Sequence, residues 1–170
     1  SLNGGTDYDS IVGIADLTAS GADTINVGVD AVQDTLIFDL DAPTGGFSVV
    51  TNFVAGTVST TEDRIVVETG TATWASSTSI RQSDSTNGAF KLIVLDNNFG
   101  GFNDFSALTA ADGIQTSETD AYVFVWNDTS GAIHVTYAVG TAGNDVATEM
   151  MTMTGVSIAN FNLGDFDFIV

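Results

Sequence analysis

The stretch Gly4-Gly5-Thr6-Asp7-Tyr8-Asp9-Ser10-Ile11-Val12 decides the expected fold, because it reads as a tight turn followed by a short strand. It follows the pattern G-G-x-G-x-D-x-U-x, in which U is a large apolar residue, and Asp7 stands where the third glycine is usual. Glycines permit the backbone angles of a tight turn, and the apolar U residue turns one face of the strand toward a core. A chain that repeats this unit coils into parallel strands.

Parts of the same pattern recur in the first 65 residues. Gly21–Asn26 (GADTIN) fits G-x-D-x-U-x, and the shorter D-x-U occurs at Asp34–Leu36 and Asp63–Ile65. Glycine-turn carbonyls and aspartate carboxylates are the oxygen ligands that Ca²⁺ prefers. The alternative interpretation is ordinary Gly/Asp turns before strands. The calcium interpretation predicts metal sites at Gly4, Gly5, Asp7, Asp9, Gly21, Asp23, Asp34 and Asp63.

The charge balance excludes some partners. The chain has 3 basic and 22 acidic residues, which gives a net charge of −19. Phosphate binding requires basic side chains, so we expect no nucleic-acid partner. Mutual repulsion of the carboxylates weakens a compact state unless salt or bound cations offset it, which again favours calcium.

Composition also limits the class of protein. The chain of 170 residues is 44% hydrophobic and contains no cysteine, so it has material for a packed core but no disulfide or thiolate metal site. It has no apolar run long enough to cross a bilayer as a helix, and we expect no membrane insertion.

Nearly every expected element is a strand, because runs rich in Val, Ile, Thr and Phe alternate with Gly, Asn and Asp. We predict an all-β fold that is β-sandwich-like, with a short calcium β-roll-type N-terminal segment. The predicted strands are residues 24–29, 35–40, 47–54, 64–68, 90–95, 122–126, 133–139 and 166–170.

Three regions are expected to form one compact unit: a roll-type cap with its strands at 1–68, a loop or weak edge strands at 69–89, and a C-terminal β domain at 90–170. Two hairpins are predicted inside them. One joins residues 35–40 to 47–54 through DAPTGG, and the other joins 122–126 to 132–139 through NDTSG.

The sequence favours no catalytic site. His134 is the only histidine, and strand alternation places it opposite Tyr137, as a packed or solvent-facing residue. No H-E-x-x-H or G-x-S-x-G motif occurs. With 22 acidic residues some carboxylate pair will always suit a glycosidase, so such a pair decides nothing. We expect a protein that is not an enzyme.

Three segments, in this order, resemble RTX-type proteins that are secreted by the type I route, and surface-layer proteins. They are the opening nine-residue motif, residues 34–67 with D-x-L-x-F and D-x-I-x-V, and residues 120–170, which end in D-F-x-V. The resemblance implies calcium binding, folding outside a bacterial cell, and an uncleaved C-terminal secretion signal. The roll is nearly absent, and residues 69–119 match nothing in the family. The implied secretion and assembly tail is Asp165, Phe166, Asp167, Phe168, Ile169 and Val170.

Three functions follow as hypotheses. The first is a secreted, non-catalytic structural protein at or outside the bacterial surface, which assembles with other copies of itself into a layer, sheath or filament with calcium support. The second is the C-terminal export and folding domain of a larger adhesin or enzyme. The third is a carbohydrate- or surface-binding module, with Trp74 as its exposed aromatic residue and cell-surface polysaccharide as its partner.

Overall fold

The structure is a computed structural model, which describes most of the 170 residues. The described residues are 2–3, 10–12, 24–29, 32–39, 48–56, 61–69, 73–74, 77–82, 86–87, 90–103, 114–115, 120–139 and 146–169.

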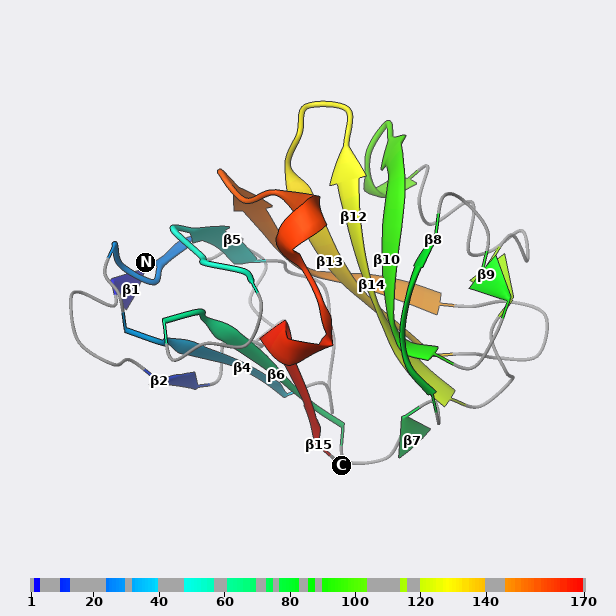
Figure 1. Cartoon of the computed structure of the whole chain (residues 1–170), viewed down its shortest axis with the longest axis horizontal. Helices are drawn as coiled ribbons and strands as arrows, with labels where there is room; N and C mark the ends of the chain where they lie inside the picture. Colours follow the sequence, from blue (N-terminus) through cyan, green and yellow to red (C-terminus); the bar gives the residue numbers. More distant parts are fainter. Residues whose placement is uncertain are drawn as a thin grey trace.

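The all-β prediction is confirmed (Figure 1), because the described chain is mostly strand with two short 3₁₀ turns. No helix in this part of the chain is long and apolar enough to span a bilayer. The elements are β1 (Leu2–Asn3), β2 (Ser10–Val12), β3 (Thr24–Asn26), β4 (Thr35–Asp39), β5 (Ser48–Thr51), β6 (Arg64–Glu68), β7 (Thr73–Trp74), β8 (Ser77–Gln82), β9 (Thr86–Asn87), β10 (Phe90–Phe99), β11 (Ile114–Gln115), β12 (Asp120–Asp128), β13 (Ile133–Val139), β14 (Val146–Thr154), η1 (Ile158–Asn160), η2 (Leu163–Asp165) and β15 (Phe166–Ile169).

The strands form three sheets. Sheet A has the order β1-β3-β5-β14-β13-β12-β10-β8, with β7 paired to β12. Sheet B has the order β15-β6-β4-β2, and sheet C pairs β11 with β9. Only the β12–β13 and β13–β14 pairs are antiparallel, and every other described pair is parallel.

The first six strands alternate between sheets A and B, so the chain runs as a parallel coil with one strand of each sheet in every turn. In sheet A, Leu2 pairs with Ile25 and Ile25 with Val50, so the chain returns to register after 23 and then 25 residues. In sheet B, Ile11 pairs with Leu36 and Leu36 with Ile65, returns of 25 and 29 residues. Two nine-residue units would return after about 18 residues, so these turns are wider than that repeat.

The C-terminal segment supplies a fourth turn of the same coil. β14 pairs in parallel with β5, and β15 pairs in parallel with β6. Because β14 and β15 follow each other in the chain, residues 146–169 occupy the place of the next coil turn although they lie some hundred residues beyond β5 and β6. Figure 1 shows β15 beside β6, with the C-terminus at the end of this strand.

A second alternation occurs between β8 and β12. β8, β10 and β12 lie in sheet A, whereas β9 and β11, which fall between them in the chain, pair with each other in sheet C. Sheet A therefore joins two parallel regions through the antiparallel strands β12, β13 and β14.

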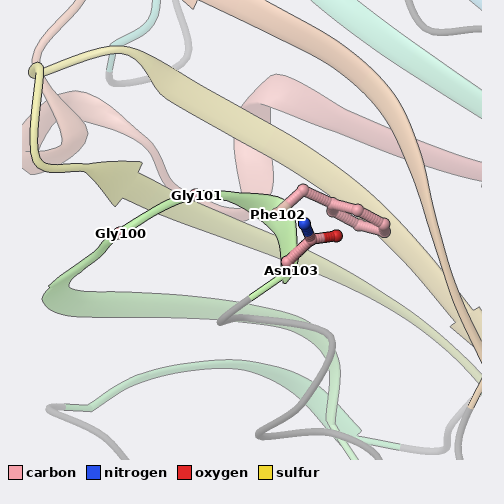
Figure 2. Close-up of a pocket in the computed structure, with 4 residues that line it drawn as sticks. All are labelled: Gly100, Gly101, Phe102 and Asn103. Carbon is pink, nitrogen blue, oxygen red and sulfur yellow. The ribbon is translucent and has the colours of Figure 1, made fainter.

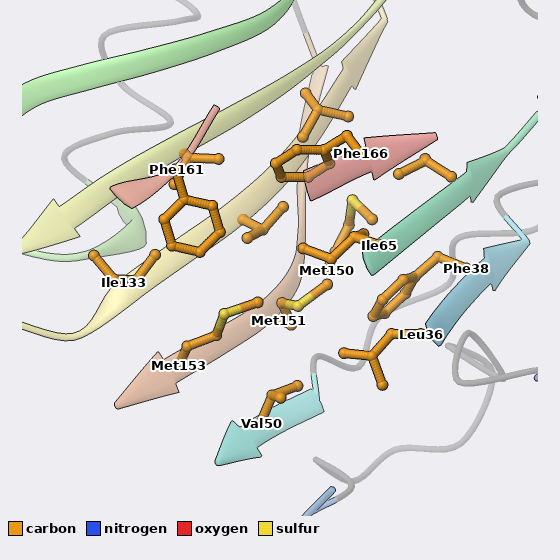
Figure 3. Close-up of a cluster of buried hydrophobic side chains, with 14 of the residues drawn as sticks. Leu36, Phe38, Val50, Ile65, Ile133, Met150, Met151, Met153, Phe161 and Phe166 are labelled. Carbon is orange, nitrogen blue, oxygen red and sulfur yellow. The ribbon is translucent and has the colours of Figure 1, made fainter. Parts of the chain in front are cut away.

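The main core lies between sheets A and B, and Figure 3 shows side chains of both sheets directed into this space. Its residues stack in register from one coil turn to the next, and each large apolar side chain buried in this way contributes about 1.5–3 kcal/mol. The two stacks, all at most 3% exposed, are Ile25, Val50 and Met153 in sheet A and Leu36, Ile65 and Phe166 in sheet B.

One predicted hairpin is correct and the other is wrong. β12 and β13 pair antiparallel around the NDTSG turn, as expected. β4 and β5 do not pair, because β4 belongs to sheet B and β5 to sheet A. A chain that crosses to the facing sheet also reverses direction, so the same turn residues suit both connections. β4 and β5 instead face each other across the main core, where Leu36 of β4 and Val50 of β5 are both buried.

A buried carboxylate links successive turns of the coil. Oδ1 of Asp63 accepts the backbone N–H of Asp34 at 2.9 Å, and Oδ2 accepts that of Val54 at 2.8 Å. Asp34 and Asp63 are 2% and 3% exposed and precede β4 and β6 at matching positions. The aspartate of the D-x-U pattern thus satisfies the buried N–H at the start of β4 and a partly buried N–H after β5.

We predict that Asp63→Ala lowers the free energy of unfolding by about 2–4 kcal/mol, because two partly or fully buried N–H groups lose their acceptor. Glu68→Ala, which removes an exposed carboxylate from β6, the strand that follows Asp63, is the control and should change the free energy of unfolding by less than about 0.5 kcal/mol. Urea unfolding monitored by circular dichroism measures both values. Equal effects of the two substitutions would contradict the assigned role of Asp63.

Candidate functional site

The only histidine lies between two carboxylates on the face of sheet A that points away from the main core. His134 lies in β13, Asp128 ends β12, and Glu149 lies in β14, so neighbouring strands supply all three side chains. Nδ1 of His134 contacts Oε1 of Glu149, and Nε2 lies 3.4 Å from Oδ2 of Asp128. The imidazole stacks on Trp126 with ring centroids 4.0 Å apart. We call these four residues the His134 cluster.

A β-bulge places Glu149 in the cluster. Val135 pairs with Met151 but Thr136 pairs with Glu149, so Met150 is an extra residue in β14. Without it, strand alternation would turn Glu149 to the same face as Met151, into the main core. Bulges redirect side chains in this way, and here the bulge brings a carboxylate to the histidine.

Asp128 is a fixed negative charge in this cluster. Its Oδ1 accepts hydrogen bonds from the Ser130 N–H at 2.8 Å, the Ser130 hydroxyl at 2.7 Å and the Ala132 N–H at 2.9 Å. Burial acts to raise the pKa of Asp128, but the bonds from Ser130, Ala132 and His134 outweigh it and lower the pKa to about 2. These bonds also close the turn between β12 and β13.

Hydrophobic rings enclose the cluster. Trp126 is fully buried in a second core on this face of sheet A. Its indole N–H donates to the Thr136 hydroxyl at 3.0 Å, and Phe99 packs edge-on against the indole ring. Nε2 of His134 is buried and faces Oδ2 of Asp128, 3.4 Å away. The imidazole side chain is 10% exposed, so little of it is open to a substrate.

The geometry of the His134 cluster favours a structural role. Ser130 donates to Asp128 rather than to His134, so the serine and histidine do not form a nucleophile–base pair. The cluster instead joins three central strands through one imidazole. That the chain is not an enzyme stays a prediction.

Two surface hollows lie near strand ends. One, of about 280 Å³, follows β10, and the N–H of Thr129 donates to the C=O of Phe99 beside it. Figure 2 shows Phe102 and Asn103 projecting from the chain that lines it. The other, of about 270 Å³, lies at the carboxyl ends of β3, β5 and β14. None of the described residues that line them carries a charge. Their lining residues are Gly100, Gly101, Phe102 and Asn103 in the first, and Gly28, Val29, Asn52, Phe53, Val54, Thr154 and Gly155 in the second.

Only two of the predicted calcium residues lie in the described chain. Asp34 and Asp63 are brought together, but the Asp63 carboxylate is bonded to backbone N–H groups, so its position needs no cation. In the described residues, no three histidine or acidic side chains gather as a metal site. The other predicted calcium residues, which are Gly4, Gly5, Asp7, Asp9, Gly21 and Asp23, lie outside the described residues, and calcium binding there stays a prediction.

The predicted tail is docked on its own chain. Phe166–Ile169 form β15 against β6, and Asp167 pairs with Arg64 at 2.7 Å. Asp165 is buried at the start of the strand, and Ile169 is 45% exposed at its end. Val170 lies outside the described residues.

Trp74, expected as an exposed platform, is partly buried and packs on this tail. Its indole N–H donates to the C=O of Ile169 at 2.9 Å, and its ring lies edge-on to Phe168 and Tyr137. These contacts are those of a packing residue, which leaves the carbohydrate-binding hypothesis without support from Trp74.

Sequence reasoning placed His134 opposite Tyr137 correctly, since Tyr137 belongs to the main core and His134 does not. It missed Asp128 and Glu149 as its partners. The adjacent Met150 and Met151 are a weak signal of the bulge, because strict alternation cannot bury both in one core.

Comparisons with protein-family models, with curated proteins and with solved structures find no match for this chain. The function must therefore be inferred from the geometry and charge of the chain itself.

We predict that Glu149→Ala lowers the free energy of unfolding by about 1–3 kcal/mol, because a buried imidazole nitrogen loses its acceptor. Thr154→Ala, an exposed change in the same strand, should have little effect. The imidazole proton resonances of the single histidine give a second readout, since stacking on Trp126 shifts them upfield. Unchanged stability and unchanged resonances in Glu149→Ala would contradict the His134 cluster.

Proposed function

We propose that the chain is a secreted, non-catalytic extracellular structural protein that assembles with other copies of itself and is supported by calcium. The observation that carries this proposal is the parallel coil of strands β1–β6, whose outermost strands β1 and β2 lie at the same end of sheets A and B. In the described chain, neither of these strands has a strand partner on its outer side. Figure 1 shows β1 beside the N-terminus and β2 at the same end of the molecule.

Such a coil end favours association, because edge strands offer unpaired N–H and C=O groups to another strand. Two edges at one end offer these groups in two facing sheets at once. An added pair of strands would also bury the apolar residues between the sheets, as β14 and β15 do at the other end of the coil.

Calcium supports this function through charge. A net charge of −19 opposes both compact folding and the approach of a second copy. Bound divalent cations reduce this repulsion, and a ligand that binds only the folded state stabilises it. The glycine and aspartate residues of the opening motif are the candidate ligands, and a calcium β-roll-type segment is the finer structure that this proposal implies.

We predict that calcium raises the melting temperature and promotes assembly. Calorimetry and electron microscopy should be carried out with calcium, with EDTA, and with magnesium in EGTA at matched ionic strength, because the last condition separates calcium binding from general screening. Particles that remain monomeric at high concentration in all three conditions would count against the proposal. Assembly without calcium would contradict the role of calcium and leave the proposed self-assembly standing.

A second candidate function is an export and folding domain of a larger protein. It is favoured by one observation, namely that residues 146–169 supply the last turn of the coil. The coil is then complete only after residues 146–169 have crossed the envelope, which suits a domain that folds outside the cell.

Deletion of residues 164–170 removes β15, exposes the β6 edge and should abolish both cooperative refolding and export. Ile169→Ser keeps the strand and changes an exposed side chain, so it should refold and be exported normally. Cell fractionation and refolding assays measure the two effects. Normal export of the deletion would refute the export function while leaving self-assembly open.

A further inference from the structure

The two ring nitrogens of His134 meet their carboxylates in different ways. Nδ1 contacts Oε1 of Glu149, whereas Nε2 lies 3.4 Å from Oδ2 of Asp128. A hydrogen bond between a charged N–H and a carboxylate usually spans about 2.7–2.9 Å. The Nε2–Oδ2 separation is therefore wider than such a bond requires, although the β12–β13 hairpin holds the two residues close together.

The contact with Glu149 decides which form of the imidazole faces Asp128. A carboxylate only accepts hydrogen bonds, so Nδ1 carries the proton in this contact, and in a neutral imidazole the other nitrogen is then an acceptor. Nε2 thus directs its lone pair at the Asp128 carboxylate, whose Oδ1 accepts three hydrogen bonds from Ser130 and Ala132. Two acceptors that face each other are favourable only with a cation between them.

The distance between these two atoms fits a metal ion in that place. The nitrogen and oxygen ligands of a tetrahedral zinc site lie about 2.0–2.1 Å from the ion, which sets two ligands about 3.3–3.4 Å apart. The Nε2–Oδ2 distance of 3.4 Å matches this separation. Histidines that bind metals commonly donate the other ring N–H to a carboxylate, which fixes the ring, and Glu149 occupies that position at His134.

We propose that Nε2 of His134 and Oδ2 of Asp128 are ligands of Zn²⁺ or a similar first-row divalent metal, with Glu149 as the positioning residue. Imidazole nitrogen suits such metals, whereas Ca²⁺ and Mg²⁺ prefer oxygen ligands. The chain supplies two ligands, and water completes the coordination from the side of the exposed turn residues Ser130 and Gly131. This site does not rest on the proposed function or on its calcium.

Two properties of the chain bear on metal binding here. The pKa of Asp128, about 2, keeps its carboxylate ionised and able to act as a ligand. The net charge of −19 also attracts cations to the whole surface. A measurement of zinc binding must therefore distinguish the His134–Asp128 pair from the other carboxylates.

The imidazole itself makes this distinction. His134 is the only histidine and the chain has no cysteine, so its imidazole resonances report a single nitrogen site. Zn²⁺ is titrated into the whole chain in excess Mg²⁺, which competes for surface carboxylates, and binding is followed by NMR of the imidazole and by calorimetry.

Three variants accompany the unmodified chain. Asp128→Asn keeps the acceptor that closes the turn but replaces the ligand carboxylate with an amide. Glu149→Gln keeps an acceptor for Nδ1 and removes its charge. Glu68→Gln removes a charge at an exposed site of β6 and is the control.

In the unmodified chain and in Glu68→Gln, we expect Zn²⁺ to shift the imidazole resonances with one-site binding. Asp128→Asn should weaken this binding at least about tenfold, and Glu149→Gln should weaken it by a smaller factor through the orientation of the ring. Equal Zn²⁺ affinity in Asp128→Asn and the unmodified chain overturns the site. Imidazole resonances of the unmodified chain that do not respond to Zn²⁺ also overturn it, because a proton then occupies the place of the metal, and this outcome requires no variant to fold.

Discussion

The structure depends on the stacking of one coil turn on the next. Leu36, Ile65 and Phe166 come from three distant parts of the chain and are neighbours only because β4, β6 and β15 pair in parallel and in register. A shift by one residue would turn each of these side chains to the opposite face, and in one direction Thr35, Arg64 and Asp165 would take their places in the core. The Asp63 carboxylate reinforces the same register, since it reaches the N–H of Asp34 only when the two turns are aligned.

This constraint explains how the two halves of the molecule form one structure. The C-terminal segment completes the N-terminal coil, and the antiparallel strands β12, β13 and β14 join that coil to the strands that alternate with sheet C. The His134 cluster lies on these joining strands, so its contacts hold the part of sheet A where parallel pairing gives way to antiparallel pairing. Charge acts against this arrangement at its edges, where Glu62 and Asp165 lie close together in a chain with very few cations.

Much of the local structure follows from sequence, but apart from the β12–β13 hairpin the strand pairing does not. The alternation of apolar residues predicts the strands and the buried face of β13. The aspartates two residues before Leu36 and Ile65 predict where β4 and β6 begin. The same D-x-U pattern suggested calcium, but for Asp63 the structure shows backbone bonds, which the residue types alone do not distinguish. The connection between β4 and β5 was misjudged because hairpins and crossings between facing sheets use the same turn residues. The pairing of β15 with β6 depends on contacts between distant segments, which no local pattern encodes, and the adjacent Met150 and Met151 are only a weak signal of the bulge.

The central claim, that the C-terminal strand closes the coil of its own chain in this register, can be tested by disulfide formation, because the chain has no cysteine. Glu68 and Ile169 are register partners on β6 and β15, and both are exposed. Adjacent strands lie about 4.8 Å apart, within the range that a disulfide bridges. The double variant Glu68→Cys with Ile169→Cys should form an intramolecular disulfide on mild oxidation, and Glu68→Cys with Asp167→Cys, two residues out of register, should not. Equal crosslinking of both pairs, or crosslinks found only between chains, would contradict the coil.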